Sequence, residues 1–91
     1  MGKYARMRLR YLKEHQPALY ASLLFSGKLH EHLSEIETSA QTMMENIVGK
    51  LKEKQGITET IKAIDQMRWV AEMESIQANA EETIMNDLIY Q

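Results

Sequence analysis

The sequence contains no cysteine, one proline, one tryptophan and one phenylalanine among its 91 residues. Without cysteine the chain can form no disulfide, thiolate metal site or cysteine nucleophile, and it fits a reducing cytoplasm. No apolar run approaches the roughly 20 residues that a membrane helix needs. The basic and apolar residues near the start look superficially like a secretory signal, but Glu14 and Pro17 interrupt them and Lys28 follows at once. We therefore expect a cytoplasmic protein without a signal peptide or a membrane span.

The sequence also lacks the period-two alternation of strands and any repeat of solenoid length. Apolar residues recur instead at steps of three and four, as on one face of a helix. In the stretch 28–55 this face comprises Leu29, Leu33, Ile36, Ala40, Met43, Ile47 and Leu51. We predict a single all-α domain of residues 1–91, with helices at about 3–14, 17–26, 28–55 and 58–90. The two short helices should pack on an antiparallel hairpin of the two long ones.

Proline and glycine mark the expected helix ends. Gln16 and Pro17 separate the first two helices, because the residue before proline avoids the helical region and proline suits a first helical position. Gly27 and Gly56 are expected to end the second and third helices. Gly49 costs about 1 kcal/mol within a helix, so the third helix either breaks there or continues to Gly56. The wide apolar face of the second helix predicts its burial against the hairpin.

Charge is unevenly distributed along the chain. Residues 1–13 hold five bases and no acid, whereas residues 14–91 hold six bases and thirteen acids. The two parts therefore carry +5 and −7, which gives the net charge of −2. This split suggests a basic arm that meets a polyanion and a body that does not.

Four of the five N-terminal bases share one face of the first helix. At about 100° per residue they span roughly 80°, and Tyr4, Met7 and Tyr11 form a separate apolar stripe. We call these four bases the basic wedge: Lys3, Arg6, Arg10 and Lys13. The wedge can contact nucleic acid phosphates with help from Arg8, while Tyr4 or Tyr11 stacks or donates to the backbone. The alternatives are a solvated helix face and contact with an anionic membrane or an acidic protein.

The fourth helix carries two apolar stripes instead of one. The two stripes lie about 150° apart on the helical wheel, and the apolar residues change from the first stripe to the second near Trp69. The first stripe comprises Ile57, Ile61, Ile64, Met67 and Ala71. The second comprises Trp69, Met73, Ile76, Ala80 and Ile84. A helix that packs against a single partner needs only one apolar stripe. The second stripe should therefore face the short helices, a second chain or both. We expect a homodimer and take this second stripe as the candidate interface.

No arrangement of residues typical of catalysis or metal binding appears. His30 and His32 are two residues apart, so they point to different sides of a helix and cannot chelate one ion. The paired glutamates occupy positions expected to be exposed, and the chain has neither a nucleophile elbow nor a glycine-rich phosphate loop. We expect no enzymatic activity, no cofactor and no metal.

Six segments of the chain carry a resemblance to a known family, and they are 10–15, 23–33, 58–59, 65–67, 69–70 and 88–90. In these segments the chain resembles the transposon-encoded TnpV family of mobile elements in Gram-positive bacteria. The resemblance covers nearly the whole chain and includes no catalytic motif. It implies an accessory role in the life of a mobile element, and a similarity to phage excisionases has been suggested for such proteins. The usual excisionase is a winged helix with a β-hairpin wing, and no strand is expected here.

The charge split and the resemblance together predict a transposon accessory protein that binds duplex DNA through its basic first helix, and the resemblance implies an excisionase-like role. The alternative is a helical interaction or dimerisation module. Such a module would contact a recombinase or another protein of the element through the hairpin, and its basic arm would remain solvated.

Overall fold

The computed structural model describes residues 1–91 and contains helices but no strands, so the all-α class is confirmed. The elements in chain order are α1 (Lys3–His15), α2 (Pro17–Phe25), α3 (Leu29–Gln55), α4 (Glu59–Ile64), α5 (Gln66–Ile84) and the π-helical turn η1 (Met85–Ile89). None of these helices is both long and apolar enough to cross a membrane.

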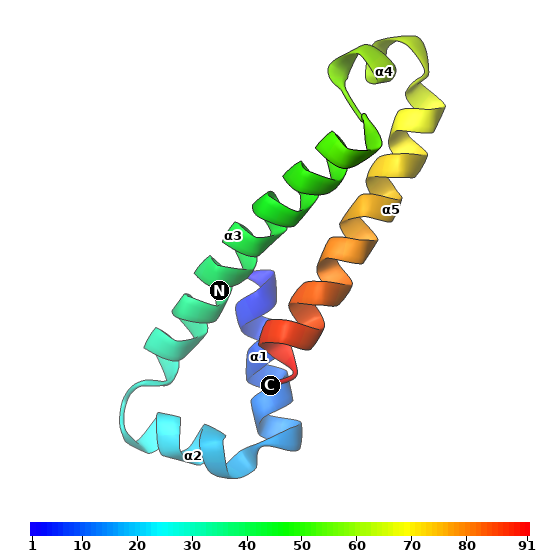
Figure 1. The fold of residues 1–91 in the computed structure, drawn as a ribbon. Coiled ribbons are helices and arrows are strands. Elements are labelled where there is room, and N and C mark those ends of the chain that lie inside the picture. Colours follow the sequence, from blue (N-terminus) through cyan, green and yellow to red (C-terminus); the bar gives the residue numbers. More distant parts are fainter.

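The long helices α3 and α5 lie side by side and run in opposite directions, with α4 turning the chain at one end (Figure 1). At the other end α1 packs against α3 and η1, and α2 connects α1 to α3. The molecule is elongated, with extents of 55 × 19 × 19 Å. It is therefore three helices thick at the end that holds α1 and only two helices thick toward α4.

The helix ends follow the local chemistry of proline and glycine. Pro17 occupies the first turn of α2, directly after Gln16 ends α1. Gly27 and Gly56 adopt the left-handed region, with φ of 75° and 67°, which a residue with a Cβ disfavours. Gly49 does not interrupt α3, which continues to Gln55.

The prediction of one continuous helix over residues 58–90 is wrong in two places. Asp65 leaves the helical region and caps a new helix, because its side chain accepts a hydrogen bond from the Arg68 N–H at 3.1 Å. The segment is thus divided into α4 and α5, and its last turn widens into η1. The break separates Ile64 of the first stripe from the second stripe, whereas Met67 and Ala71 of the first stripe lie on α5 with the second stripe and are exposed.

The core lies where α1, α3, α5 and η1 meet. A cluster of buried residues there comprises Tyr4, Ala40, Ile84 and Ile89. The predicted burial of α2 is wrong: this helix contains no buried residue, and Phe25 at its end is 87% exposed. Because α2 only bridges the ends of α1 and α3, α1 is the short helix that completes the core.

Candidate nucleic-acid interface

The first turn of α1 is fixed by a carboxylate from α3. Glu37 Oε1 accepts a hydrogen bond from the Ala5 N–H at 3.0 Å, and Gln41 donates to its other oxygen at 3.0 Å. Burial raises the pKa of Glu37, but these bonds and one from the Tyr4 N–H outweigh burial and hold that pKa below its ordinary value. Gly2 leaves room for this contact, because a Cβ there would overlap the Glu37 carboxylate. An anion from another helix therefore caps α1.

The middle of α1 is tied to the end of the chain by Arg8, which is 5% exposed. Its guanidinium donates from one nitrogen to the backbone oxygens of Ile89 and Gln91, both at 2.8 Å. Gln16 donates to the same Gln91 oxygen at 2.5 Å. Burial lowers the pKa of Arg8 from its ordinary value. Arg8 thus satisfies the last carbonyl of η1, which has no partner within the helix, and an oxygen beyond the end of η1.

His32, on α3, completes the group of residues that contact Arg8, which we call the Arg8 cluster. Its Nε2 accepts a hydrogen bond from Arg8 Nε at 3.2 Å. Burial lowers the pKa of His32, and the neighbouring Arg8 cation lowers it further. A neutral imidazole is required because a protonated one has no acceptor atom. His32 is half-buried, whereas His30 is exposed on another side of α3.

The basic wedge lies on the opposite side of α1 from Arg8. Arg6, Arg10 and Lys13 are exposed, and Arg6 and Arg10 form no ion pair. Arg6 donates only to the Met1 carbonyl, at 3.0 Å. Lys3 differs, because its Nζ lies 2.7 Å from Glu81 Oε1 and this hydrogen bond raises the pKa of Lys3. Three cations of the wedge therefore remain available to a ligand without breaking an internal ion pair.

Two of the residues proposed for nucleic acid contact lie in the interior. Arg8 is committed to the cluster described above, and Tyr4 is 4% exposed in the core. The sequence held a signal for both positions. Arg8 follows Tyr4 by one turn and precedes the fully buried Leu12 by one turn, about 180° from the centre of the basic wedge.

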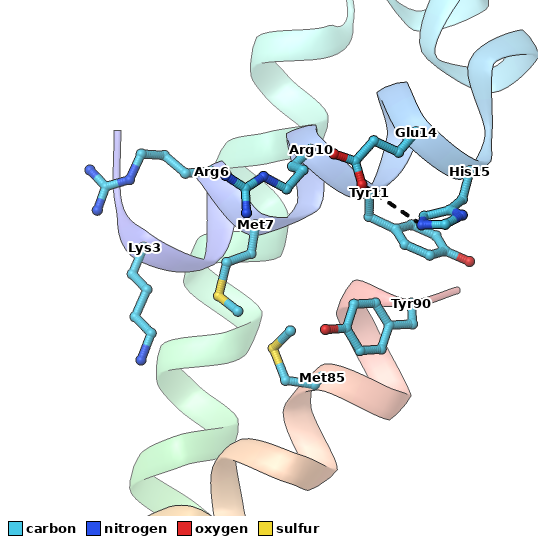
Figure 2. Close-up of a pocket in the computed structure, with 9 residues that line it drawn as sticks. All are labelled: Lys3, Arg6, Met7, Arg10, Tyr11, Glu14, His15, Met85 and Tyr90. Atoms are coloured by element: carbon cyan, nitrogen blue, oxygen red, sulfur yellow. Dashed lines mark ion pairs between the residues drawn. The ribbon is translucent and has the colours of Figure 1, made fainter.

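Beside the wedge, α1 and the end of the chain enclose an open groove of about 760 Å³. Figure 2 shows the aromatic rings of Tyr11, His15 and Tyr90 at one end, and Lys3 and Arg6 at the other. The full lining comprises Lys3, Arg6, Met7, Arg10, Tyr11, Glu14, His15, Met85 and Tyr90. Cations and apolar rings therefore border the same hollow.

The aromatic end of the groove is formed by residues from two elements. The Tyr11 ring centroid lies 5.1 Å from that of His15 and 5.4 Å from that of Tyr90. Tyr11 is half-buried, whereas Tyr90 is 50% exposed. Nothing in the local sequence connects Tyr90 to the basic wedge. It joins Tyr11 because the Arg8 cluster holds the end of the chain against α1.

The candidate dimer stripe includes residues that are buried inside the single chain. Ile76, Ala80 and Ile84 are buried within the single chain, and Trp69 and Met73 are half-buried. The stripe thus packs largely within the molecule. Exposed apolar residues lie at both ends of the molecule. At the α4 end Ile64 is 75%, Met67 86% and Val70 41% exposed, and on α2 the exposed apolar residues are Leu19, Leu24 and Phe25.

Comparison with known proteins gives one match. The family model described as transposon-encoded protein TnpV matches residues 1–89 of the chain. No curated protein and no solved structure matches it.

Proposed function

The chain belongs to the family of transposon-encoded TnpV proteins, and from this premise we propose a non-enzymatic accessory protein of a mobile element that binds DNA through the basic wedge. The observation that carries the proposal is the exposure of Arg6, Arg10 and Lys13 on one face of α1, with Arg6 and Arg10 free of ion pairs. The remainder of the chain, residues 14–91, carries a net charge of −7, so acidic side chains were available to pair with these bases.

Phosphate contact is the interaction that suits these side chains. Arginine presents a planar fork of donors that matches phosphate oxygens, and both arginines hold it in solvent. The anchors at Glu37 and Arg8 fix α1 on the body, so its wedge is a rigid surface with a defined direction. Such contacts position a protein on DNA without reading its sequence. An excisionase-like role would build on this binding.

The test is fluorescence-anisotropy binding to a labelled duplex across a salt series. If Arg6, Arg10 and Lys13 each neutralise one phosphate, log affinity falls against log salt with a slope of about −2.7. The double variant Arg6→Glu/Arg10→Glu should weaken binding strongly and flatten the slope by about 1.8.

The matched control is Lys50→Glu/Lys54→Glu, which makes the same charge change at exposed positions near the far end of α3. This control should bind nearly as the wild type does. Equal weakening by both double variants would show a response to net charge alone, and folded wild type that fails to bind at low salt would end the proposal.

A second function has its own observation, which is the exposed apolar surface formed by Ile64, Met67 and Val70. We propose that a second copy of the chain covers this surface. Asp65 and Arg68 beside it carry opposite charges, and Lys62 lies over the Trp69 ring at 4.6 Å. A rim with both signs is suited to a symmetric interface, in which each residue meets its counterpart on an identical surface.

Light scattering during gel filtration tests this dimer. Met67→Glu should shift the mass from dimer to monomer, whereas Phe25→Glu, at an equally exposed apolar position on α2, should leave the dimer intact. A monomeric wild type would contradict the dimer and favour a different protein of the element, such as a recombinase, as the occupant. Dissociation by Phe25→Glu alone would move the interface to α2.

A further inference from the structure

We propose that the groove between α1 and η1 receives an unpaired nucleotide, with its base against the rings of Tyr90 and Tyr11 and its phosphates on Arg6 and Arg10. This inference rests on the proposed DNA binding and specifies the form of nucleic acid that the same surface prefers. It assigns a role to Tyr90, which the basic wedge alone does not include.

The size and chemistry of the groove fit a nucleotide. Its volume of about 760 Å³ falls within the range of small-molecule sites. Met7 and Met85 face each other across it from α1 and η1 (Figure 2). Thioethers and aromatic rings make favourable contacts with the flat, polarizable face of a base.

The ring of Tyr90 is suited to stacking because half of its surface is open to solvent. It meets the Tyr11 ring at an interplanar angle of 47°, so the two rings do not stack face to face on each other. Tyr11 in turn has the guanidinium carbon of Arg8 at 5.8 Å from its centroid, which holds it in place from the interior. A base entering the groove would therefore find a supported aromatic wall.

The charges of the groove place the phosphates at its other end. Arg6 and Arg10 line it without an ion pair, whereas Lys3 is paired with Glu81 and Glu14 lies 3.8 Å from His15. A strand that crosses the groove can therefore lay its backbone along the two arginines and its base toward the tyrosines. This combination of cations and stacking rings is the usual chemistry of single-strand binding.

A fully paired duplex cannot use this aromatic wall. The bases of a duplex are stacked on one another, so the duplex exposes only base edges and phosphates. It would contact Arg6 and Arg10 but would not stack on the Tyr90 ring. A strand with an unpaired base gains stacking, which is worth roughly 5- to 150-fold in affinity per base. The groove therefore favours single strands and locally opened duplexes over paired DNA.

The experiment compares anisotropy binding to a paired duplex, the same duplex with a short central bubble, and single strands of DNA and of RNA. Wild type should bind the bubble about 5- to 150-fold more tightly than the duplex. Tyr90→Leu should bring this affinity ratio close to one, and Tyr90→Phe, which retains the ring, should preserve it. Phe25→Leu is the matched control, because it removes an exposed ring outside the groove.

A second measurement does not depend on a variant that folds. The fluorescent base 2-aminopurine, placed in the bubble, should be quenched by wild-type protein when it stacks in the groove. Single-stranded RNA that binds as tightly as DNA would show that the site recognises the unpaired base and not the sugar, which agrees with the proposal.

The outcomes separate this inference from the proposed function. Equal affinity for bubble and duplex with a steep salt slope would overturn the nucleotide site and leave DNA binding by the wedge in place. A bubble preference that survives in Tyr90→Leu, without quenching of 2-aminopurine, would also overturn it. Failure to bind any probe at low salt would end both proposals.

Discussion

Replacement of Arg8 by methionine should destabilise the protein far more than the same replacement of Arg10. Both arginines belong to α1, and each substitution removes one positive charge and introduces the same helix-forming side chain. They differ in environment, because Arg8 is 5% exposed and donates three hydrogen bonds, whereas Arg10 is exposed. The comparison therefore isolates the cluster that holds the end of the chain.

The expected loss follows from the partners that Arg8 leaves behind. The Ile89 carbonyl would lose its donor in a buried position, which costs about 1–3 kcal/mol. The Gln91 oxygen keeps the bond from Gln16, and His32 is only half-buried, so each of these losses is about 0.5–1.5 kcal/mol. Methionine relieves some of the desolvation that lowers the pKa of Arg8. The net loss should be about 2–4 kcal/mol, a large share of the 5–15 kcal/mol that is typical for a domain.

Urea unfolding followed by far-UV circular dichroism measures this difference. Arg8→Met should shift the midpoint strongly and lower the melting temperature by about 10 °C or more. Arg10→Met should stay within about 0.5 kcal/mol of wild type. If the two variants were equally stable, Arg8 would not anchor the end of the chain, and the position of Tyr90 in the groove would lose its explanation.

Further predictions concern the cap of α1 and the protonation of His32. Gly2→Ala should lower the free energy of unfolding by about 0.5–2 kcal/mol, because the added methyl group displaces the capping Glu37 carboxylate. Gly49→Ala has open space around it and should stabilise α3 by about 0.5–1 kcal/mol. Thermal melts that rank the two variants alike would contradict the role of Glu37 as the cap. Because the pKa of His32 is lowered in the folded state, the unfolded chain takes up this proton first as pH falls. The His32 contribution is therefore complete above about pH 6.5 and is lost as pH falls from there through the folded pKa. Melting temperatures should fall over this acidic range, and His32→Gln, whose amide oxygen can still accept from Arg8, should reduce the slope; an unchanged slope would show that His32 is not the group responsible.

Much of the fold could be read from local patterns. Apolar residues at helical spacing indicated the all-α class, and Pro17, Gly27 and Gly56 marked helix ends because their backbone preferences act within one or two residues. The break at Asp65 is not evident in the sequence because Asp65 lies in an otherwise periodic segment, and the change of apolar face near Trp69 falls within α5. The burial of α2 was wrong because apolar composition cannot say whether a partner is within reach.

The features of the candidate site also fall into two groups, those that the local sequence determines and those that depend on tertiary contacts. The basic wedge depends only on the angle between successive residues of a helix, so the sequence by itself determined that Lys3, Arg6, Arg10 and Lys13 share a face. Helical geometry also separated Arg8 from them, but only the tertiary structure decided what Arg8 does. Its partners Ile89 and Gln91 lie more than 80 positions away along the chain. The same long-range contact brings Tyr90 to Tyr11 and creates the groove, because side chains so distant in sequence meet only when the packing of α1 against α3 and η1 has joined the two ends of the chain.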